Sequence, residues 1–320
     1  MSEQRDYQEM LEKAEVLNPW FTEREIRRSL RAISECYLNE RILAQWLEEY
    51  GISDGTRRNV VGIVAAGNIP VVSFHDVLCA LACNARVRIK LSHKDQPVCR
   101  YVYRYIEQEG LAFDFAETGE LPVADKFIVT GSDITRRDLQ SKLSHVPVLA
   151  RGHRNAVAVL FGNESGTELM ALGHDVFAYY GLGCRNVSKL YLPSGFDPCD
   201  LLENWNASFP WVREHPLYVR HFKYAKAFHT LMRSKGVFSG PVALVPGKAV
   251  PSAIATLHFE YFSDLADLNL RLRADVGSVQ CICSARDLSE FKSVRMGQAQ
   301  FPGLFDYADG MDTMKFILES

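Results

Sequence analysis

The chain has 320 residues, of which 47% are hydrophobic and 23% are charged. This balance is that of a folded globular protein long enough for two domains, and it excludes a largely disordered chain. The net charge of −3 provides no broad basic field, which argues against a nucleic-acid partner, and no apolar run is long enough to cross a bilayer.

The eight cysteines indicate a reducing compartment rather than a disulfide framework. Their density is ordinary for a chain of this length, and the polar N-terminus does not resemble a secretory signal. No cysteine pair has the C-x-x-C spacing of a zinc site, and the histidines form no recognisable ligand cluster. We therefore expect a cytoplasmic protein without a metal.

The first elements along the chain are helical. Thr22 and Glu25 match a T-x-x-E capping box ahead of apolar residues at helical spacing. A further helix is expected from about Glu40, and Gly51 stands where a helix C-cap belongs. These helices precede the first expected strand.

From Val60 the pattern changes to strands that alternate with helices. Strands are expected over residues 60–66, 87–91, 111–115 and 126–130, with helices over 73–83 and 97–109 between them. Strand–helix–strand units at this spacing predict a mainly parallel, doubly wound sheet.

A second α/β region begins near Arg151. Its strands are expected over 155–161, 187–192, 241–245, 253–262 and 279–284, with helices over 165–180, from about 199, over 216–232 and over 264–273. We place N-terminal helices and a cofactor-binding domain in residues 1–150 and a catalytic domain in 151–290. Residues 291–320 form a C-terminal segment that returns to the cofactor-binding or oligomerisation region.

Cys184 is the strongest candidate for chemistry among the cysteines. It follows Gly181-Leu182-Gly183 and precedes Arg185 and an apolar strand. The glycines let substrate and cofactor approach the backbone, and an adjacent cation favours the thiolate, which is the nucleophilic form. The other interpretation is a buried core cysteine, the usual location of this residue. We expect the other seven cysteines to be structural.

Four segments, taken in order, resemble motifs of the aldehyde dehydrogenase superfamily. Residues 67–70 (GNIP), 87–92 (VRIKLS), 129–132 (VTGS) and 181–184 (GLGC) are similar to its N-x-P, K-P-S, T-G-S and G-Q-x-C motifs. The resemblance implies a two-lobed α/β fold of the aldehyde dehydrogenase type. One lobe is a Rossmann-like parallel sheet that binds the cofactor, and the other is an α/β catalytic domain.

The chain resembles more closely the fatty acyl-CoA reductases known from bacterial luminescence, the LuxC family, and within it a short bacterial subgroup. Residues 74–76 (FHD), 297–300 (GQAQ) and 306–310 (DYADG) add to that resemblance, which covers nearly the whole chain after the first helix. The sequence suggests no physical role for the last two of these segments.

The resemblance implies that Cys184 is the nucleophile and that Asn68 helps to bind the oxyanion. In the superfamily the matching amide acts together with the backbone N–H of the nucleophile, and such a donor contributes about 3–4 kcal/mol. From the residues alone, N-I-P is also simply a favourable turn sequence.

Cofactor residues are expected at the end of the strand over 87–91. Lys90 and Ser92 could hold the ribose and phosphate of a nucleotide. In many NAD-using relatives a Glu follows the K-P-S motif, whereas this chain has His93 and then Lys94. Basic side chains attract a 2′-phosphate that a carboxylate would repel, so we expect NADPH, with NADH as the alternative.

A second set of cofactor residues is expected in the turn Thr130-Gly131-Ser132. This turn precedes a helix candidate, so its N–H groups could face a pyrophosphate. Relatives usually have another glycine after it, where this chain has Arg136. That side chain could replace the glycine-rich cradle by its charge, or could lie on a solvated helix face.

The general base of aldehyde oxidation is missing from its expected position. Where aldehyde-oxidising relatives carry a Glu before two glycines, this chain has Ala150-Arg151-Gly152-His153. Hydrolysis of an acyl-enzyme needs a base that activates water, whereas reduction of the acyl-enzyme does not. The resemblance and this departure together predict NADPH-dependent reduction of a fatty acyl-CoA, or another acyl thioester, to the aldehyde.

Three other functions stay open: an aldehyde-oxidising dehydrogenase, an acyl-transferring or thioesterase-like protein, and a non-catalytic scaffold of the same fold. The apolar run over residues 314–318 bears on assembly. In the superfamily a late strand crosses to a neighbouring subunit, so the resemblance implies a homo-oligomer.

Overall fold

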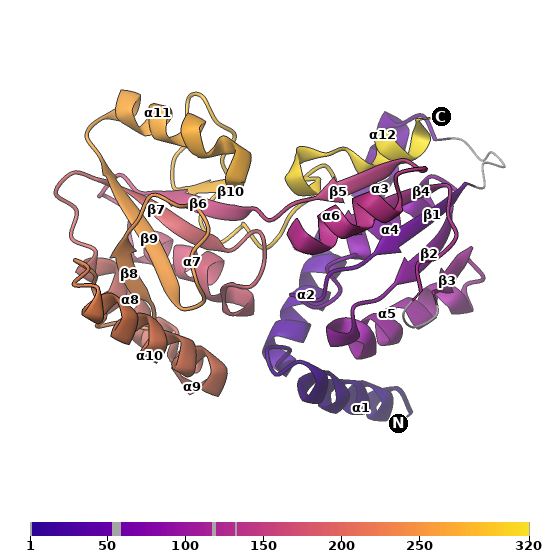
Figure 1. The fold of residues 1–320 in the computed structure, drawn as a ribbon, viewed down its shortest axis with the longest axis horizontal. Helices are drawn as coiled ribbons and strands as arrows, with labels where there is room; N and C mark the ends of the chain where they lie inside the picture. Colours follow the sequence, from indigo (N-terminus) through magenta and orange to yellow (C-terminus); the bar gives the residue numbers. More distant parts are fainter. Residues whose placement is uncertain (1, 53–58, 117–119, 132, 320) are drawn as a thin grey trace. The chain divides into compact units, whose positions relative to one another are not determined.

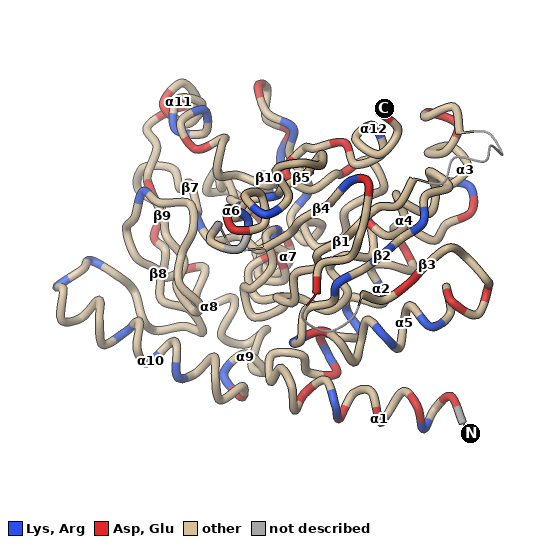
Figure 2. The backbone as a smooth tube through the Cα atoms, turned by 45° about the vertical axis from the view of Figure 1, so that its right-hand side comes forward, with Lys and Arg blue, Asp and Glu red and all other residues tan. Residues whose placement is uncertain are grey.

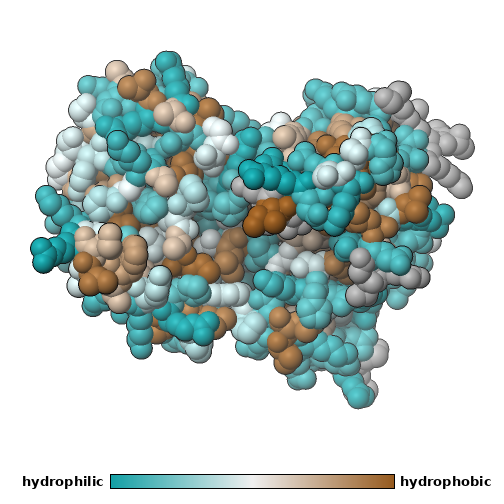
Figure 3. Space-filling model, in the orientation of Figure 1, coloured by the Kyte–Doolittle hydropathy of each residue, from teal (hydrophilic) through white to brown (hydrophobic). Residues whose placement is uncertain are grey.

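The computed structural model describes residues 2–52, 59–116, 120–131 and 133–319, which divide into two compact units. Unit 1 comprises Met1–His153 and Pro302–Ser320, and unit 2 comprises Arg154–Phe301. Each unit contains one five-stranded sheet (Figure 1). Acidic and basic residues are interspersed over most of both units (Figure 2), and hydrophilic side chains surround smaller hydrophobic areas on the face seen in Figure 3.

Unit 1 begins with helices and continues with strands that alternate with helices. Its elements are α1 (Ser2–Leu17), α2 (Glu23–Tyr37), α3 (Glu40–Glu49), β1 (Val60–Val64), α4 (Phe74–Ala82), β2 (Arg86–Lys90), η1 (His93–Asp95), α5 (Gln96–Gln108), β3 (Phe113–Phe115), β4 (Lys126–Thr130), α6 (Asp133–Lys142), β5 (Val148–Arg151), η4 (Ala308–Gly310) and α12 (Thr313–Leu318).

The sheet of unit 1 is parallel and has the order β3-β2-β1-β4-β5. The apolar, β-branched run of β1 is suited to a strand that is covered on both faces, and four of its five residues are buried. One core joins this sheet to the N-terminal helices and includes Trp46, Ile63 and Tyr103. Met314 and Ile317 of α12 belong to the same core.

Unit 2 has a second alternating series of strands and helices. Its elements are β6 (Asn155–Val159), α7 (Gly166–Phe177), η2 (Ala178–Gly181), β7 (Val187–Pro193), α8 (Cys199–Ser208), α9 (Pro210–Glu214), α10 (Pro216–Leu231), β8 (Ala243–Pro246), β9 (Thr256–Phe262), α11 (Leu265–Asp275), η3 (Val276–Ser278) and β10 (Val279–Ser284).

The sheet of unit 2 is also parallel, with the order β10-β6-β7-β9-β8. All five residues of β6 are buried, as expected of an interior strand with helices on both faces. The α/β class and the parallel sheets predicted from the sequence are therefore confirmed, and most predicted elements occur close to their expected positions.

Some local features differ from those expected. Thr22 is the N-cap residue of α2, but its side chain makes no capping hydrogen bond. The buried Glu25 carboxylate pairs with Arg28 at 3.0 Å. The helix expected over 165–180 ends at Phe177. The short strand β5 is not among those expected. The late segment forms helix α12, with Asp312 as its N-cap, where the resemblance implies a strand.

The unit boundaries differ from the expected domain boundaries at 150 and 290. Strand β5, which ends at Arg151, pairs with β4 and so belongs to the first sheet. Val294 bridges to Cys283 of β10, which keeps the segment after residue 290 in unit 2. The homo-oligomer was expected because a late strand would cross to a neighbouring subunit, whereas α12 packs within its own unit. The homo-oligomer therefore stays a prediction.

Among the described residues, no helix combines the length and the apolar character that crossing a bilayer would require.

Candidate active site

Cys184 lies in unit 2, in the turn between η2 and β7, and is partly buried. The three residues that lead into this turn, Tyr179, Tyr180 and Gly181, have left-handed φ angles of 49°, 55° and 81°. Such angles cost a residue with a side chain about 1–3 kcal/mol each and persist only where the surroundings impose them. This turn is therefore held by its neighbours.

Asn186 holds the turn from inside. Its side chain is 1% exposed, and its Oδ1 accepts a hydrogen bond of 2.7 Å from the backbone N–H of Gly183. Its Nδ2 donates to the carbonyls of Asp175, at 3.0 Å, and Ala178, at 2.8 Å. One buried amide thus connects the last turn of α7 to the residue before Cys184.

Aromatic packing supports the left-handed backbone from the other side. The ring of Tyr180 lies 4.3 Å from His215, 5.3 Å from Trp211 and 6.1 Å from Tyr218, between ring centroids. Burying an aromatic side chain in such a cluster is strongly favourable, which offsets the backbone strain at Tyr180. The start of α10 is therefore packed against the turn that leads to Cys184.

The segment 297–300, one of the two without an assigned role, packs against the Cys184 turn; we call it the clasp. Nε of Arg185 donates to the carbonyl of Ala299 at 2.6 Å, and Nε2 of Gln300 donates to the carbonyl of Arg185 at 2.9 Å. The cation next to Cys184 in the sequence therefore also has a positioning role.

Asp175 of α7 anchors the clasp. Its two carboxylate oxygens accept hydrogen bonds from the backbone N–H groups of Gly297, at 2.6 Å, and Ala299, at 3.0 Å. Burial raises the pKa of Asp175 to about 7, while these N–H donors oppose the rise. The buried carboxyl group of Asp175 thus joins α7 to the clasp, to which Arg185 is also hydrogen-bonded.

Asn68 lies in unit 1, exposed, in the turn that follows β1. At the first residue of this turn the backbone passes close to the side chain of Ser92, since a Cβ on Gly67 would stand 2.3 Å from Oγ of Ser92. Only glycine fits there without displacing that hydroxyl. Ser92, an expected cofactor residue, is thus in direct contact with the Asn68 turn.

The end of the same turn is held by buried polar groups. Val71 has a φ of 53°, a strained angle for a β-branched residue, and its N–H donates to Oδ2 of Asp95 at 2.7 Å. The hydroxyl of Ser29 donates to the carbonyl of Pro70 at 2.6 Å. Burial raises the pKa of Asp95 to about 8, so this anchor is protonated over much of the neutral range.

The expected cofactor residues lie at or just after the ends of two strands of unit 1 that flank β1. Lys90 ends β2 and Thr130 ends β4, and β1 pairs with both strands. Because the strands are parallel, these ends and the Asn68 turn lie at one edge of the sheet. His93 is exposed in η1, and Gly131 is partly buried. Ser132 lies outside the described residues.

No family model and no curated protein matches the chain. Solved structures are similar to it at low identity. Aldehyde dehydrogenase 21 of Physcomitrella patens, solved with succinate, is 13% identical with a TM-score of 0.58, over 81% of this chain and 66% of that one. An NAD-dependent aldehyde dehydrogenase of Sinorhizobium meliloti is 13% identical with a TM-score of 0.52, over 70% of this chain and 54% of that one. Aldehyde dehydrogenase C of Pseudomonas syringae, solved with NAD⁺ and octanal, is 12% identical with a TM-score of 0.57, over 89% and 72%.

The chain has the aldehyde dehydrogenase fold. It spans less than two thirds of the length of the first two of these enzymes. The fold predicted from the four short motifs is therefore confirmed, and the similarity extends well beyond those motifs.

The residues of unit 1 fit a nicotinamide nucleotide. In the aldehyde dehydrogenase fold seen here, β1 is the strand from which the sheet is wound in both directions, and ligands of open α/β sheets bind at the carboxyl ends beside such a switch point. The glycine at 67 leaves no side chain over the turn, and Gly131 does the same after β4. Lys90 and Lys94 supply positive charge at this edge.

Arg151 occupies the part of the sequence where a catalytic Glu is missing. It ends β5 and is 4% exposed. Nη1 of Arg151 donates to Oδ2 of Asp76 at 2.7 Å, and Nη2 donates to Oγ1 of Thr313 at 2.6 Å. This buried cation fastens α12 and α4 to the edge of the sheet.

The segment 306–310, the other one without an assigned role, completes this attachment. Oδ2 of Asp309 accepts a hydrogen bond from the N–H of Gly152 at 3.0 Å. The hydroxyl of Tyr307 accepts from Nε1 of Trp46 at 2.8 Å and lies 2.7 Å from the hydroxyl of Tyr50. Residues 306–310 therefore bind the C-terminal segment to α3 and β5 within unit 1.

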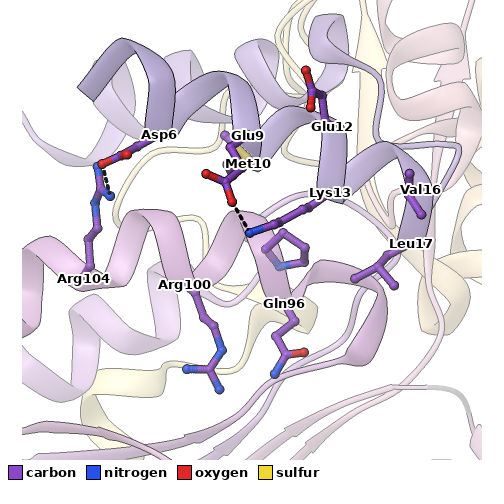
Figure 4. Close-up of a pocket in the computed structure, with 11 residues that line it drawn as sticks. Asp6, Glu9, Met10, Glu12, Lys13, Val16, Leu17, Gln96, Arg100 and Arg104 are labelled. Carbon is purple, nitrogen blue, oxygen red and sulfur yellow. Dashed lines mark hydrogen bonds and ion pairs between the residues drawn. The ribbon is translucent and has the colours of Figure 1, made fainter. Parts of the chain in front are cut away.

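A groove of about 850 Å³ runs between α1 and α5 (Figure 4), and none of the expected site residues lines it. Its charges are largely paired across or along the helices, with Lys13 on Glu9 at 2.5 Å and Arg104 on Asp6 at 3.2 Å. The guanidinium of Arg100 lies over the ring of Phe115. This arrangement provides little net charge for a ligand.

Of the expected site residues that the structure describes, Cys184 is in unit 2 and the others are in unit 1. Sequence reasoning missed Asn186, Asp175 and Asp95. An acid such as Asp175, standing among the apolar residues of a helix, is a signal that could have been noticed. The partners of Asn186 are backbone groups, so the sequence carries no comparable signal for it.

Proposed function

We propose that this protein reduces a fatty acyl-CoA, or a similar acyl thioester, to the aldehyde with NADPH, through an acyl-enzyme on Cys184. The observation that carries the proposal is the strained turn around Cys184, which Asn186, Tyr180 and the clasp hold in place. A cysteine with only a packing role does not require such a support. The LuxC-type assignment is part of the same proposal.

The first step is acyl transfer. The sulfur of Cys184, as a thiolate, forms a bond to the thioester carbonyl carbon while the bond from that carbon to the CoA sulfur breaks. CoA leaves as a thiolate. Exchange of one thioester for another is nearly neutral in free energy, so the rate depends on positioning and on oxyanion donors.

The second step is reduction of the acyl group. When bound, a reduced nicotinamide nucleotide supplies a hydride to the acyl carbon. The bond between that carbon and the Cys184 sulfur then breaks, its electrons return to sulfur, and the aldehyde is released. Over both steps one proton is taken up, and CoA, aldehyde and oxidised nucleotide are formed.

The residues proposed to hold the nucleotide are those at the carboxyl edge of the sheet in unit 1. Thr130 and Gly131 would bind phosphate through backbone N–H groups, and Lys90 and Ser92 would contact the ribose side. The preference for NADPH rests on His93, which stands where a repelling carboxylate would otherwise be.

Asn68 is the proposed side-chain donor to the carbonyl oxygen. Its exposure and the buried supports of its turn, Asp95 and Ser29, favour this role, because an oxyanion donor must be accessible and fixed. The pairing of Arg151 with Asp76 favours reduction over aldehyde oxidation, because a buried arginine cannot act as a base toward water.

Steady-state kinetics test the proposal. Acyl-CoA should drive NADPH oxidation with one aldehyde formed per NADPH consumed. Cys184→Ala should abolish this reaction, Cys199→Ala should leave it intact, and Asn68→Ala should lower kcat by about 10²–10³. His93→Glu should shift the preference toward NADH. CoA release without NADPH oxidation would indicate a thioesterase or acyltransferase instead.

A further inference from the structure

Helix α10 and the residues after it carry positive charge only. From His215 to Phe259 the sequence contains no Asp or Glu, although the whole chain has 39 acidic and 36 basic residues. Figure 2 shows blue and no red along α10. Five exposed cations lie on α10 or within four residues of its end: Arg220, Lys223, Lys226, Arg233 and Lys235. In the described parts of the chain, no ion pair involves any of these five.

The same surface bears an apolar ridge. Tyr224 is 70% exposed, Phe228 46%, Leu231 82% and Met232 62%. The first three stand at i, i+4 and i+7, so they form one row along the helix, and the rings of Tyr224 and Phe228 stack with centroids 6.3 Å apart. Arg220 begins this row one turn earlier. We call the surface from Arg220 to Arg233 the α10 face.

The opposite side of α10 is already used by unit 2. Tyr218 and Ala225 are buried, and Tyr218 packs against Tyr180 in the turn that leads to Cys184. The core of unit 2 therefore accounts for one side of the helix and leaves the apolar ridge outside. Figure 3 shows hydrophobic atoms beside hydrophilic ones at the left-hand edge, in the part where Figure 1 draws the end of α10.

We infer that the α10 face binds the surface of an anionic lipid bilayer. A helix that presents aromatic and aliphatic side chains together with lysines and arginines binds in the plane of the interface, with its apolar side chains at the headgroup–acyl boundary. The cations match lipid phosphates, and their charge is of one sign over a long surface. The inference does not depend on the reaction proposed above.

Vesicle sedimentation of the 320-residue chain tests it. The protein should co-sediment with vesicles of phosphatidylcholine and phosphatidylglycerol but not with phosphatidylcholine alone. Raising the ionic strength to about 0.5 M should lower the bound fraction at least about fivefold. The double variants Lys223→Glu/Lys226→Glu and Phe228→Ser/Leu231→Ser should each weaken binding about tenfold or more.

Matched controls make the result specific to the α10 face. Arg137→Glu/Lys142→Glu makes the same charge change on α6, and Leu265→Ser/Leu270→Ser removes two exposed leucines of α11. Both should bind vesicles like the unaltered chain, and circular dichroism should show all four variants folded. The inference is wrong if anionic vesicles do not bind, if neutral vesicles bind equally, or if the controls weaken binding as much. A dimer that Leu231→Ser dissociates, without vesicle binding, would assign the face to a second copy of the chain.

Discussion

Asn186 is the residue on which the geometry around Cys184 depends most. Its side-chain hydrogen bonds go to backbone groups of the turn, α7 and η2, so alanine would leave the N–H of Gly183 and the carbonyl of Ala178 buried without this partner. Each such group costs about 1–3 kcal/mol. We expect Asn186→Ala to lower the free energy of unfolding by at least about 2 kcal/mol and to change the rate at which iodoacetamide modifies Cys184.

Urea unfolding and intact-mass measurement of alkylation provide both readouts. Asn269→Ala is the matched control, because that side chain makes one exposed hydrogen bond, to Glu290, and should change stability by less than about 0.5 kcal/mol. Equal effects of the two substitutions would show that Asn186 does not support the turn.

Asp175 should make stability depend on pH. Its pKa of about 7 in the folded chain exceeds the ordinary value of 3.8, mainly through burial. Between these values the folded protein holds a proton that the unfolded chain has lost. The free energy of unfolding should therefore fall as pH rises from about 4 to about 7, by up to about 1.4 kcal/mol per pH unit from this group.

Urea unfolding at a series of pH values measures this slope. Asp95, whose pKa is raised to about 8, contributes in the same direction. The difference in slope between Asp175→Asn and the unaltered chain therefore gives the contribution of Asp175 alone. The variant should have a shallower slope, whereas Asp138→Asn on the exposed face of α6 should not. An unchanged slope in Asp175→Asn would contradict the assignment.

The turn after β1 depends on a glycine at its start. In Gly67→Ala the new methyl group would overlap both Oγ and Cβ of Ser92, and rotation of the Ser92 side chain could move only the Oγ. We expect weaker NADPH binding, by about tenfold, because the Asn68 turn and the end of β2 must separate. Fluorescence titration measures the affinity.

Two further variants test the cause. Gly67→Ala/Ser92→Gly should recover part of the lost affinity, because the overlapping hydroxyl is removed. Gly277→Ala, at a position where a methyl group meets no atom within 4 Å, should bind NADPH normally. If the double variant recovered no affinity, the Gly67–Ser92 contact would not be the reason for the weaker NADPH binding of Gly67→Ala.

Helix α12 is fastened through a buried ion pair. Asp76→Ala would leave the guanidinium of Arg151 buried without a carboxylate, which costs about 3–5 kcal/mol. Thermal denaturation should show a clearly lower Tm. Arg86→Ala breaks an exposed ion pair with Asp114 and should lower the free energy of unfolding by less than about 1 kcal/mol. Similar losses in the two variants would contradict a buried, uncompensated charge.

For the molecule as a whole, the sequence predicts the architecture well because its strands are short apolar runs at regular spacing. β1, β4 and β7 are recognisable from composition alone, since both faces of an interior parallel strand are covered. The motif order then points to the aldehyde dehydrogenase fold. These features are local, so they can be read without knowing which residues meet.

The features that could not be predicted depend on contacts between distant residues. β5 and α12 are stabilised together through Arg151, Asp76 and Thr313, which no local pattern connects. The clasp at 297–300 reaches Arg185 and Asp175 across more than a hundred residues. The left-handed Tyr179 and Tyr180 contradict local helix propensity, and only the packing of unit 2 explains them.

The central claim is that one sulfur atom carries the acyl group. Intact-protein mass spectrometry after mixing with a long-chain acyl-CoA tests it directly. We predict one acyl group per chain, located on Cys184 by peptide mapping, stable without NADPH and released as aldehyde when NADPH is added. An acyl group that still attaches to Cys184→Ala, or the absence of any acylation of the folded protein, would contradict the account.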